Sequence, residues 1–297
     1  MLQIIIGAIS LGLLWAVMTI GVYITFRILD FADLTVEGSI AMGASIAAQL
    51  IAMGVDPFLA TLLSLLGGML AGFVTGILHT KLRIPALLSG ILTMIALYSI
   101  NLRIMGKANI SLLRVRTVYT VFEGLGLGRT GAVIALGLIC ISLLVAVLYW
   151  FFGTEIGSAI RATGNNPNMV RAQGINTNTT KILGLIISNG LVALSGGLIA
   201  QSQSYADVQM GVGSIVIGLA SVIIGEVLFG KKNFMSRLIS LVLGSVTYRI
   251  IIAVVLKLGM PANDLKLFTA ITVAIALSLP VIRKILRPVK IIIREGE

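Results

Sequence analysis

Four charged side chains interrupt long apolar stretches of this sequence, and their chemistry stands out first. Asp33 and Glu37 are four residues apart at the start of one stretch, which would put them on one helix face. Glu226 lies near the end of another stretch, and Arg249 lies deep inside a third. Charges at membrane depth are costly and usually line a pathway. These four residues are therefore candidates for the path of a solute or an ion.

Each candidate also has a simpler explanation. The three acids could cluster near the inner mouth of such a path, but they can also simply lie near the membrane surface and pair there with Arg27 or Lys231. Arg249 is about fifteen residues into its stretch, roughly 22 Å along a helix, and it can snorkel to the opposite surface. Amides inside the stretches are weaker path candidates, because amides often only tie helices together; they are Asn101, Asn189 and Gln201.

Enzyme chemistry finds little support in the same stretches. No Cys, His or carboxylate cluster has the spacing of a metal site, and no nucleophile has a base that the sequence can justify, so we predict neither metal nor catalytic residues. The segment 225–232 resembles a phosphate-binding loop, but Lys232 replaces the required Ser or Thr and the segment ends an apolar stretch. We expect a chain that is no catalyst and binds no cofactor itself.

Composition explains why charges are so conspicuous. Apolar residues make up 58% of the 297 positions and charged residues 11%, and the mean hydropathy is +1.07. A soluble domain carries about 25% charged residues, so a water-soluble enzyme is excluded. The net charge of +11 comes from cations in short gaps between apolar runs. Because these gaps form no basic domain, we expect membrane lipid and no nucleic acid as a partner.

Nine apolar stretches are long enough to cross a bilayer, for which roughly 20 residues suffice. The predicted fold is therefore all-α, a single transmembrane domain over residues 1–297 with nine or ten spans. The expected spans are 3–26, 34–53, 58–80, 84–106, 130–152, 181–203, 211–230, 234–256 and 265–284.

The distribution of Lys and Arg predicts the orientation. With the C-terminus in the cytoplasm, fourteen of the 22 cations fall inside and seven outside, while Arg249 lies in a span. The loop 153–180 is then cytoplasmic, and the loop 107–129 is external although it is unusually basic. We expect a multi-pass protein of the bacterial inner (plasma) membrane.

An internal repeat accompanies these spans. Gly38–Gly43 recurs as Gly213–Gly218. The shift that takes Gly38 to Gly213 also relates spans one to four (repeat one, about 3–106) to spans six to nine (repeat two, about 181–284), with 130–152 as a linking span. An offset of five spans inverts the second repeat, which is a transporter architecture. Chance similarity among Gly- and Ser-rich helices is the alternative.

The loop 153–180 has the pattern of two short helices. Glu155 to Ala162 suits a first helix with Gly164 just past its end, and Asn165 or Asn166 can cap a second. Pro167 then opens that helix, Arg171 lies in its last turn and Gly174 ends it. Such a segment can dock another protein, and a plain solvated connector is the alternative.

Here the residues resemble a known family. Gly157, Ile160-Arg161-Ala162, Asn166-Pro167 and Gly174-Ile175 resemble the cytoplasmic loop of permeases from the branched-chain amino acid and ribose class of ABC importers. Residues 28–33 with Glu37 and Gly43, and residues 194–197, look like other segments of that family. The overall look is similar to its amino-acid permeases of the tryptophan or tyrosine type. The family usually has Asn and His near 31–34, where this chain has Phe-Ala-Asp-Leu.

The resemblance implies partners and roles. A separate ATPase subunit would bind ATP and Mg and receive the loop as a coupling helix, an external solute-binding protein would deliver cargo, and a second copy or a homologous permease would complete the pore. The chain would move a small polar solute, an amino acid, inward by alternating access. The implied ATPase-coupling residues are Glu155, Gly157, Arg161, Ala162, Asn165, Asn166, Pro167, Arg171, Gly174 and Ile175.

One rival hypothesis comes from the charged residues themselves. A secondary transporter driven by an ion gradient would use Asp33, Glu37 or Glu226 as proton or cation sites.

Overall fold

The computed structural model describes residues 2–124, 126–230, 233–259, 261, 264, 267–272, 274–275 and 278. The chain opens with helix α1 (Leu2–Tyr23), which continues into a π-helical turn, η1 (Ile24–Ile28). In this wider turn, Leu29 N–H donates to the Ile24 carbonyl at 3.0 Å, one residue further back than in an α-helix. After six residues without regular structure, 29–34, the second long helix begins.

Three helices complete the first half: α2 (Thr35–Ala52), α3 (Pro57–Thr80) and α4 (Ala86–Met105). Asp56 caps α3 by accepting hydrogen bonds from the N–H groups of Phe58 and Leu59, and Pro57 occupies the first turn. Gly106 ends α4 in the left-handed conformation. These local signals fix where the apolar stretches start and stop.

The second half is longer and less regular. It holds α6 (Arg129–Gly153), α7 (Glu155–Asn165), α8 (Pro167–Ala172), α9 (Thr177–Gln203), α10 (Ser214–Phe229) and α11 (Phe234–Lys257). Between α4 and α6 lie a short strand, β1 (Asn109–Ser111), and a short helix, α5 (Val118–Glu123). Strand β1 pairs antiparallel with β2 (Tyr205–Asp207). The fold is all-α apart from this small sheet, which the sequence did not predict.

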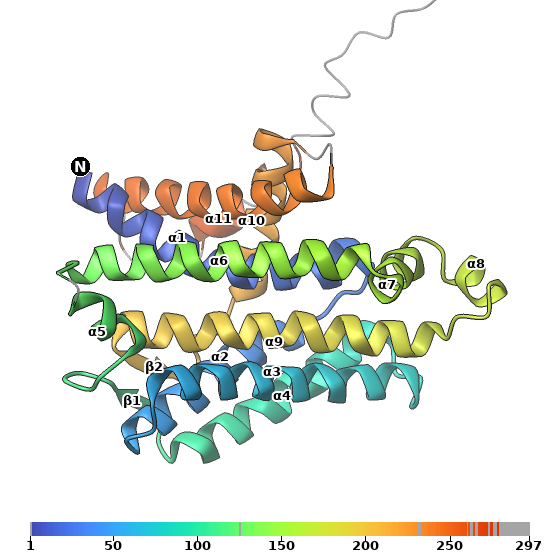
Figure 1. Ribbon diagram of the computed structural model, residues 1–297, viewed down its shortest axis with the longest axis horizontal. Coiled ribbons are helices and arrows are strands. Elements are labelled where there is room, and N and C mark those ends of the chain that lie inside the picture. Colours follow the sequence, from blue (N-terminus) through green and yellow to red (C-terminus); the bar gives the residue numbers. More distant parts are fainter. Residues whose placement is uncertain are drawn as a thin grey trace, which may run out of the picture.

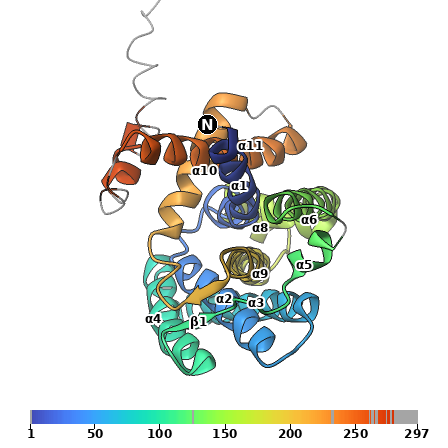
Figure 2. The ribbon, with the colours of Figure 1, turned by 90° about the vertical axis from the view of Figure 1, so that its left-hand side faces the viewer.

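The long helices form one bundle (Figure 1). Helices α7 and α8 lie at one end, and α5 lies with the two strands at the other, so residues 153–176 and 107–128 occupy opposite ends of the bundle (Figure 1). Helices α1 and α9 run through the centre, with α3 beside α9 and α11 beside α1 (Figure 2).

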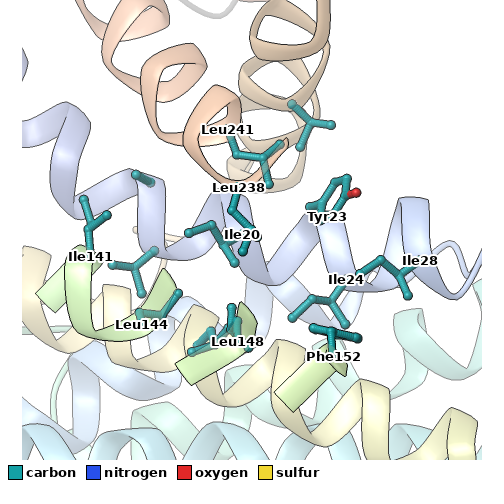
Figure 3. Packing of buried hydrophobic residues seen from close by; sticks show 14 of the residues in the cluster. Ile20, Tyr23, Ile24, Ile28, Ile141, Leu144, Leu148, Phe152, Leu238 and Leu241 are labelled. Carbon is teal, nitrogen blue, oxygen red and sulfur yellow. The ribbon is translucent and has the colours of Figure 1, made fainter. Parts of the chain in front are cut away.

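Apolar packing holds α1 between its neighbours. Figure 3 shows Ile20 and Ile24 of α1 and η1 next to Leu144 and Phe152 of α6, with Leu238 of α11 above them. All five side chains are at most 7% exposed. This cluster joins the helix that precedes the 29–34 break to the helix that precedes α7.

Seven helices in the described part of the chain are long and apolar enough to cross a membrane. The expected span 211–230 is shorter, because residues 209–213 form turns and α10 has only 16 residues. The expected ninth span, 265–284, lies mostly outside the described residues. The polytopic helical bundle is thus confirmed, and the total of nine or ten spans stays a prediction.

The glycine row of α3 explains its close contact with α9. A Cβ at Gly68 would overlap the Asn189 carbonyl, and one at Gly72 would overlap the Leu185 carbonyl. Only glycine permits this approach between two backbones.

Helix directions agree with an inverted repeat. Helices α1 and α3 run towards the end that carries α7, whereas their partners α9 and α11 run away from it (Figure 1). One pair of contacts also matches: Gly43 of α2 faces Ala193 of α9, and Gly218 of α10 faces Met18 of α1. The shift that takes Gly43 to Gly218 also takes Met18 to Ala193. The repeat boundaries themselves stay a prediction.

Candidate functional site

The segment 154–176 folds as the sequence indicated, with one exception. Asn166 caps α8 by accepting a hydrogen bond from Met169 N–H at 3.1 Å, and Pro167 opens this helix. Gly174 follows it with φ of +81°, the left-handed conformation expected at a helix end. Gly164 was expected to end the first helix, which was wrong, because α7 continues to Asn165.

Close packing explains why a glycine stands at position 164 inside α7. A Cβ at this position would overlap the Ile28 carbonyl at the end of η1. Beside it, the hydroxyls of Thr163 and Thr180 are 2.8 Å apart and join α7 to α9. Leu29 lies against Gly184 of α9 on the same side. Helix α7 therefore rests directly on the residues that lead into the 29–34 break.

The opposite face of this segment is open. Gly157, Ile160, Thr163 and Val170 are buried against the bundle. The predicted docking residues Glu155, Arg161, Asn165, Asn166, Arg171 and Gly174 are exposed, whereas Ala162, Pro167 and Ile175 are half-buried. Two apolar side chains, Ile156 and Met169, are also 53% and 44% exposed.

Two hollows flank α7. One, of about 520 Å³, lies between α7, η1 and α11 and is lined by Arg27, Asp30, Arg161 and Arg237 among others. The other, of about 500 Å³, lies between α7 and the end of α6. Arg161 lines both, and its guanidinium carbon is 5.7 Å from the centre of the Phe234 ring. Helix α7 therefore projects between two hollows, and another protein could bind around its exposed face.

Asp33 is fully buried in the segment between α1 and α2. Its carboxylate accepts hydrogen bonds from Thr35 N–H at 2.9 Å and from the Asn189 amide at 2.7 Å. Burial raises the pKa of the Asp33 carboxyl, and these hydrogen bonds oppose the rise. The expectation that Asp33 shares a helix face with Glu37 was wrong, since α2 begins only at Thr35.

The other two acids have different partners. Glu37 accepts a hydrogen bond from Gly213 N–H at 3.0 Å, just before α10 begins. Glu226 forms a salt bridge of 2.7 Å with Arg27, as the simpler explanation predicted. The structure thus gives each of the three acids its own partner and does not join them in one cluster.

The amide candidates connect helices. Asn189 accepts a hydrogen bond from the Ser39 hydroxyl at 2.7 Å, in addition to its bond with Asp33. Gln201 donates to Thr61 at 2.8 Å and accepts from Val118 N–H at 3.0 Å. Asn101 donates to the Gly38 carbonyl at 3.3 Å. These contacts suit structural ties, with Asn189 also holding the 29–34 break.

Arg249 lies against an aromatic ring, and its expected place in a solute path stays a prediction. Its guanidinium carbon lies 4.0 Å from the centre of the Trp15 ring. Among the described residues, its Nε and Nη2 atoms are buried and have no hydrogen-bond partner, and the same holds for the indole Nε1 of Trp15. The sequence did not single out Trp15, because no spacing links residues on two helices so far apart in the chain.

The segment that resembles a phosphate-binding loop does not have the surroundings of one. Gly225 lies within α10 and faces Ser240 of α11, so a helix and not a strand precedes Gly230. A phosphate-binding loop needs a strand before it and a helix after it.

Comparison with known proteins gives a consistent result. The model of a family described as "Branched-chain amino acid transport system / permease component" matches residues 4–277. A protein of Clostridioides difficile named tyrosine transport system permease protein is 44% identical over 269 residues, which cover 91% of this chain and 88% of that protein. The ribose import permease protein of Escherichia coli K12 is 26% identical over 185 residues, 61% of this chain and 56% of its own length.

A solved structure has a similar fold. It is titled an inward-facing conformation of a putative metal-chelate type ABC transporter, with a TM-score of 0.50 and 13% identity over 95% of this chain and 85% of that chain.

Proposed function

This chain belongs to the branched-chain amino acid and ribose-type permease family of ABC transporters, and from this membership we propose that it imports an amino acid as the membrane-spanning subunit of such a transporter. One observation carries the solute class. The relative that is 44% identical over nine-tenths of the chain is named for tyrosine transport. The ribose permease shares less identity over a shorter region.

Energy would come from a partner. ATPase subunits that bind ATP and Mg would dock on α7 and α8, whose exposed face and flanking hollows suit enclosure by another protein. The contact between Gly164 and the Ile28 carbonyl supports a direct mechanical path. Movement of α7 would displace η1 and the 29–34 break, and thereby α2. In this proposal ATP-driven closure opens the route outward and hydrolysis resets it.

The remaining partners complete the importer. An external solute-binding protein would deliver the amino acid at the end that carries α5 and the two strands, and a second copy or a homologous permease would complete the pore. The end with α7 would then face the cytoplasm of a bacterial cell, together with the C-terminus, in agreement with the Lys and Arg distribution.

The test is reconstitution with the partner ATPase and binding protein in liposomes. We expect ATP-dependent uptake of labelled tyrosine and no uptake of labelled ribose. The chain alone should neither hydrolyse ATP nor accumulate tyrosine under a proton gradient. Gradient-driven uptake without a partner would instead favour the secondary transporter that relies on Asp33, Glu37 or Glu226.

Orientation has its own test. In a Cys140→Ser background, single cysteines at Ser111 and Asn166 lie at opposite ends of the bundle. An impermeant thiol reagent added to cells should label the cysteine at 111 and spare the one at 166. The reverse pattern would put the docking segment, residues 154–176 with α7 and α8, outside the cytoplasm and contradict the proposal.

A further inference from the structure

Within the part of the chain that the structure describes, three buried nitrogen donors without an acceptor meet where α11 packs against α1, at Arg249 and Trp15. They belong to the Arg249 Nε and Nη2 atoms and the Trp15 indole Nε1. Buried donors are almost always paired in proteins, because an unpaired one loses its bond to water and gains nothing. A charged group in this condition is the least favourable case. An explanation is therefore needed for why the chain keeps this pair.

Depth excludes the simplest explanation, a side chain that reaches for the membrane surface. Arg249 is eight residues from the outer end of α11, about 12 Å. Side chains on a helix lean towards its N-terminus, so Arg249 leans inward from α11 and Trp15 leans outward from the antiparallel α1. The two meet at mid-depth with the guanidinium over the indole ring, 4.0 Å from its centre. The guanidinium is thus held in the bundle interior.

The inverted repeat bears on a second explanation, that the packing of these two helices needs an arginine. The shift that relates Gly38 to Gly213 also relates Val74 to Arg249, and Trp15 to Gly190. Helices α3 and α9 pack together as α11 and α1 do. In the first half, Val74 is 47% exposed, and Gly190 packs on Met69 of α3. The helices α3 and α9 thus pack together without an arginine or a tryptophan at the corresponding positions of the sequence.

The chemistry of the pair indicates what it would bind. Arginine presents donors in a planar fork that matches the two oxygens of a carboxylate, and it stays protonated. Arg249 as a residue is half-buried, whereas its Nε and Nη2 atoms are buried and would become accessible only when the guanidinium leaves the Trp15 ring. We propose that the Arg249–Trp15 pair receives the carboxylate of the amino acid during its passage through the membrane. In the absence of solute, the indole ring holds the guanidinium by a cation–π contact.

This proposal rests on the proposed import function, and it adds the group that the membrane subunit recognises. The charge of Arg249 would attract the solute carboxylate, and the guanidinium would leave the Trp15 ring to bind this carboxylate. A guanidinium that contacts an aromatic ring is released more easily than one held in a salt bridge. Binding therefore changes the surroundings of the indole, which makes the event observable.

Tryptophan fluorescence offers a direct measurement. The chain has two tryptophans, so Trp150→Phe leaves Trp15 as the only one. The complete importer carrying this change, with an ATPase whose own tryptophans are replaced, is placed in phosphatidylcholine bilayers and titrated with L-tyrosine, tyrosinamide and acetate. We expect a saturable change in emission with both carboxylates, and a response to the amide that is at least about tenfold weaker.

Matched variants identify the responsible side chain. Arg249→Gln should abolish the response and lower tyrosine uptake by about tenfold to a hundredfold, the range for losing hydrogen bonds to a charged group. Arg249→Lys keeps the charge without the fork and should fall between. Lys257→Gln removes a cation from the exposed end of the same helix and should behave as the unchanged protein in both assays.

Different results would overturn the proposal. An equal response to tyrosine and its amide, or normal uptake by Arg249→Gln, would show that the pair does not recognise a carboxylate, while the import function would stand. A change in emission caused by phosphatidylglycerol alone would assign the site to a lipid phosphate and also contradict the proposal. If the unchanged importer takes up no amino acid but Trp15 still responds to carboxylates, the import function fails and the binding site stands.

Discussion

The two connections that precede α2 and α10, the helices related by the repeat, share one hydrogen-bonded turn and differ in their surroundings. Each contains an aspartate that accepts a hydrogen bond from the N–H two residues ahead: Asp33 from Thr35 at 2.9 Å and Asp207 from Gln209 at 2.7 Å. With the repeat offset, Asp33 corresponds to position 208, next to Asp207. The local turn chemistry is thus shared between the halves.

Burial separates these connections. Asp33 is fully buried and accepts a hydrogen bond from the Asn189 amide at 2.7 Å. Asp207 is half-buried and accepts a longer one, of 3.4 Å, from the Asn109 amide, and Val212 nearby is 61% exposed. The first connection lies against α7, and the second is tied to α2 through Glu37 and the Gly213 N–H. The comparison indicates that both connections use the same turn, and that only the first is fully buried and packed against α7.

The largest expected difference in the free energy of unfolding is between variants that lack one or the other of the two aspartates. Asp33→Ala removes the acceptor for the buried Thr35 N–H and for one of the two bonds of the Asn189 amide, which keeps its bond to the Leu185 carbonyl, at a cost of about 1–3 kcal/mol for each lost bond. Asp207→Ala removes the acceptor for the N–H of the exposed Gln209, which water can replace, and should change the free energy of unfolding by about 0.5 kcal/mol or less. Thermal unfolding in detergent measures both. Equal losses would remove the difference between the two connections.

The next effect concerns the contact between α7 and the first connection. Gly164→Ala forces a methyl group against the Ile28 carbonyl and should cost about 1–3 kcal/mol. Gly153→Ala is the matched control, because a Cβ there meets no atom within 4 Å. We expect Gly164→Ala to lower solute-stimulated ATP hydrolysis by the assembled complex, and Gly153→Ala to leave it unchanged. Normal solute-stimulated ATP hydrolysis by Gly164→Ala would contradict the proposed transmission of movement from α7 to η1.

A smaller effect should appear at the second connection. Glu37→Ala removes the acceptor for Gly213 N–H, a loss of about 0.5–1.5 kcal/mol, and Glu37→Gln keeps an oxygen in place. In a Cys140→Ser background with Val212→Cys, Glu37→Ala should raise the rate of thiol labelling, and Glu37→Gln should raise it less. An unchanged rate in Glu37→Ala would mean that this hydrogen bond does not hold the second connection.

Local signals predicted much of this molecule. Apolar length and composition located the long helices to within a few residues, and Asn166, Pro167 and Gly174 were correctly assigned to their places in the docking segment. These features depend on neighbours in the chain. The family resemblance rested on that same segment, and the family comparison confirmed it.

Contacts between distant residues could not be predicted in this way. Gly164 looked like a helix end, but the nearby Ile28 carbonyl decides its role. Strands β1 and β2 have three residues each and exist only as a pair, so no periodicity reveals them. Arg249 was identified as a candidate from its charge and depth, whereas its partner Trp15 lies near the other end of the sequence and looked like any aromatic residue in a span.

The π-helical turn at the end of α1 contains one residue more than an α-helical turn would need. Such π-helical turns are often found at functional sites. If η1 tightened to an α-helix, every residue after it would rotate about the helix axis by roughly a quarter turn. Arg27 would swing away from Glu226, and the chain entering the 29–34 break would change direction. A change from π- to α-helical geometry in these five residues would therefore rotate the end of α1 at the place where it contacts Gly164 of α7.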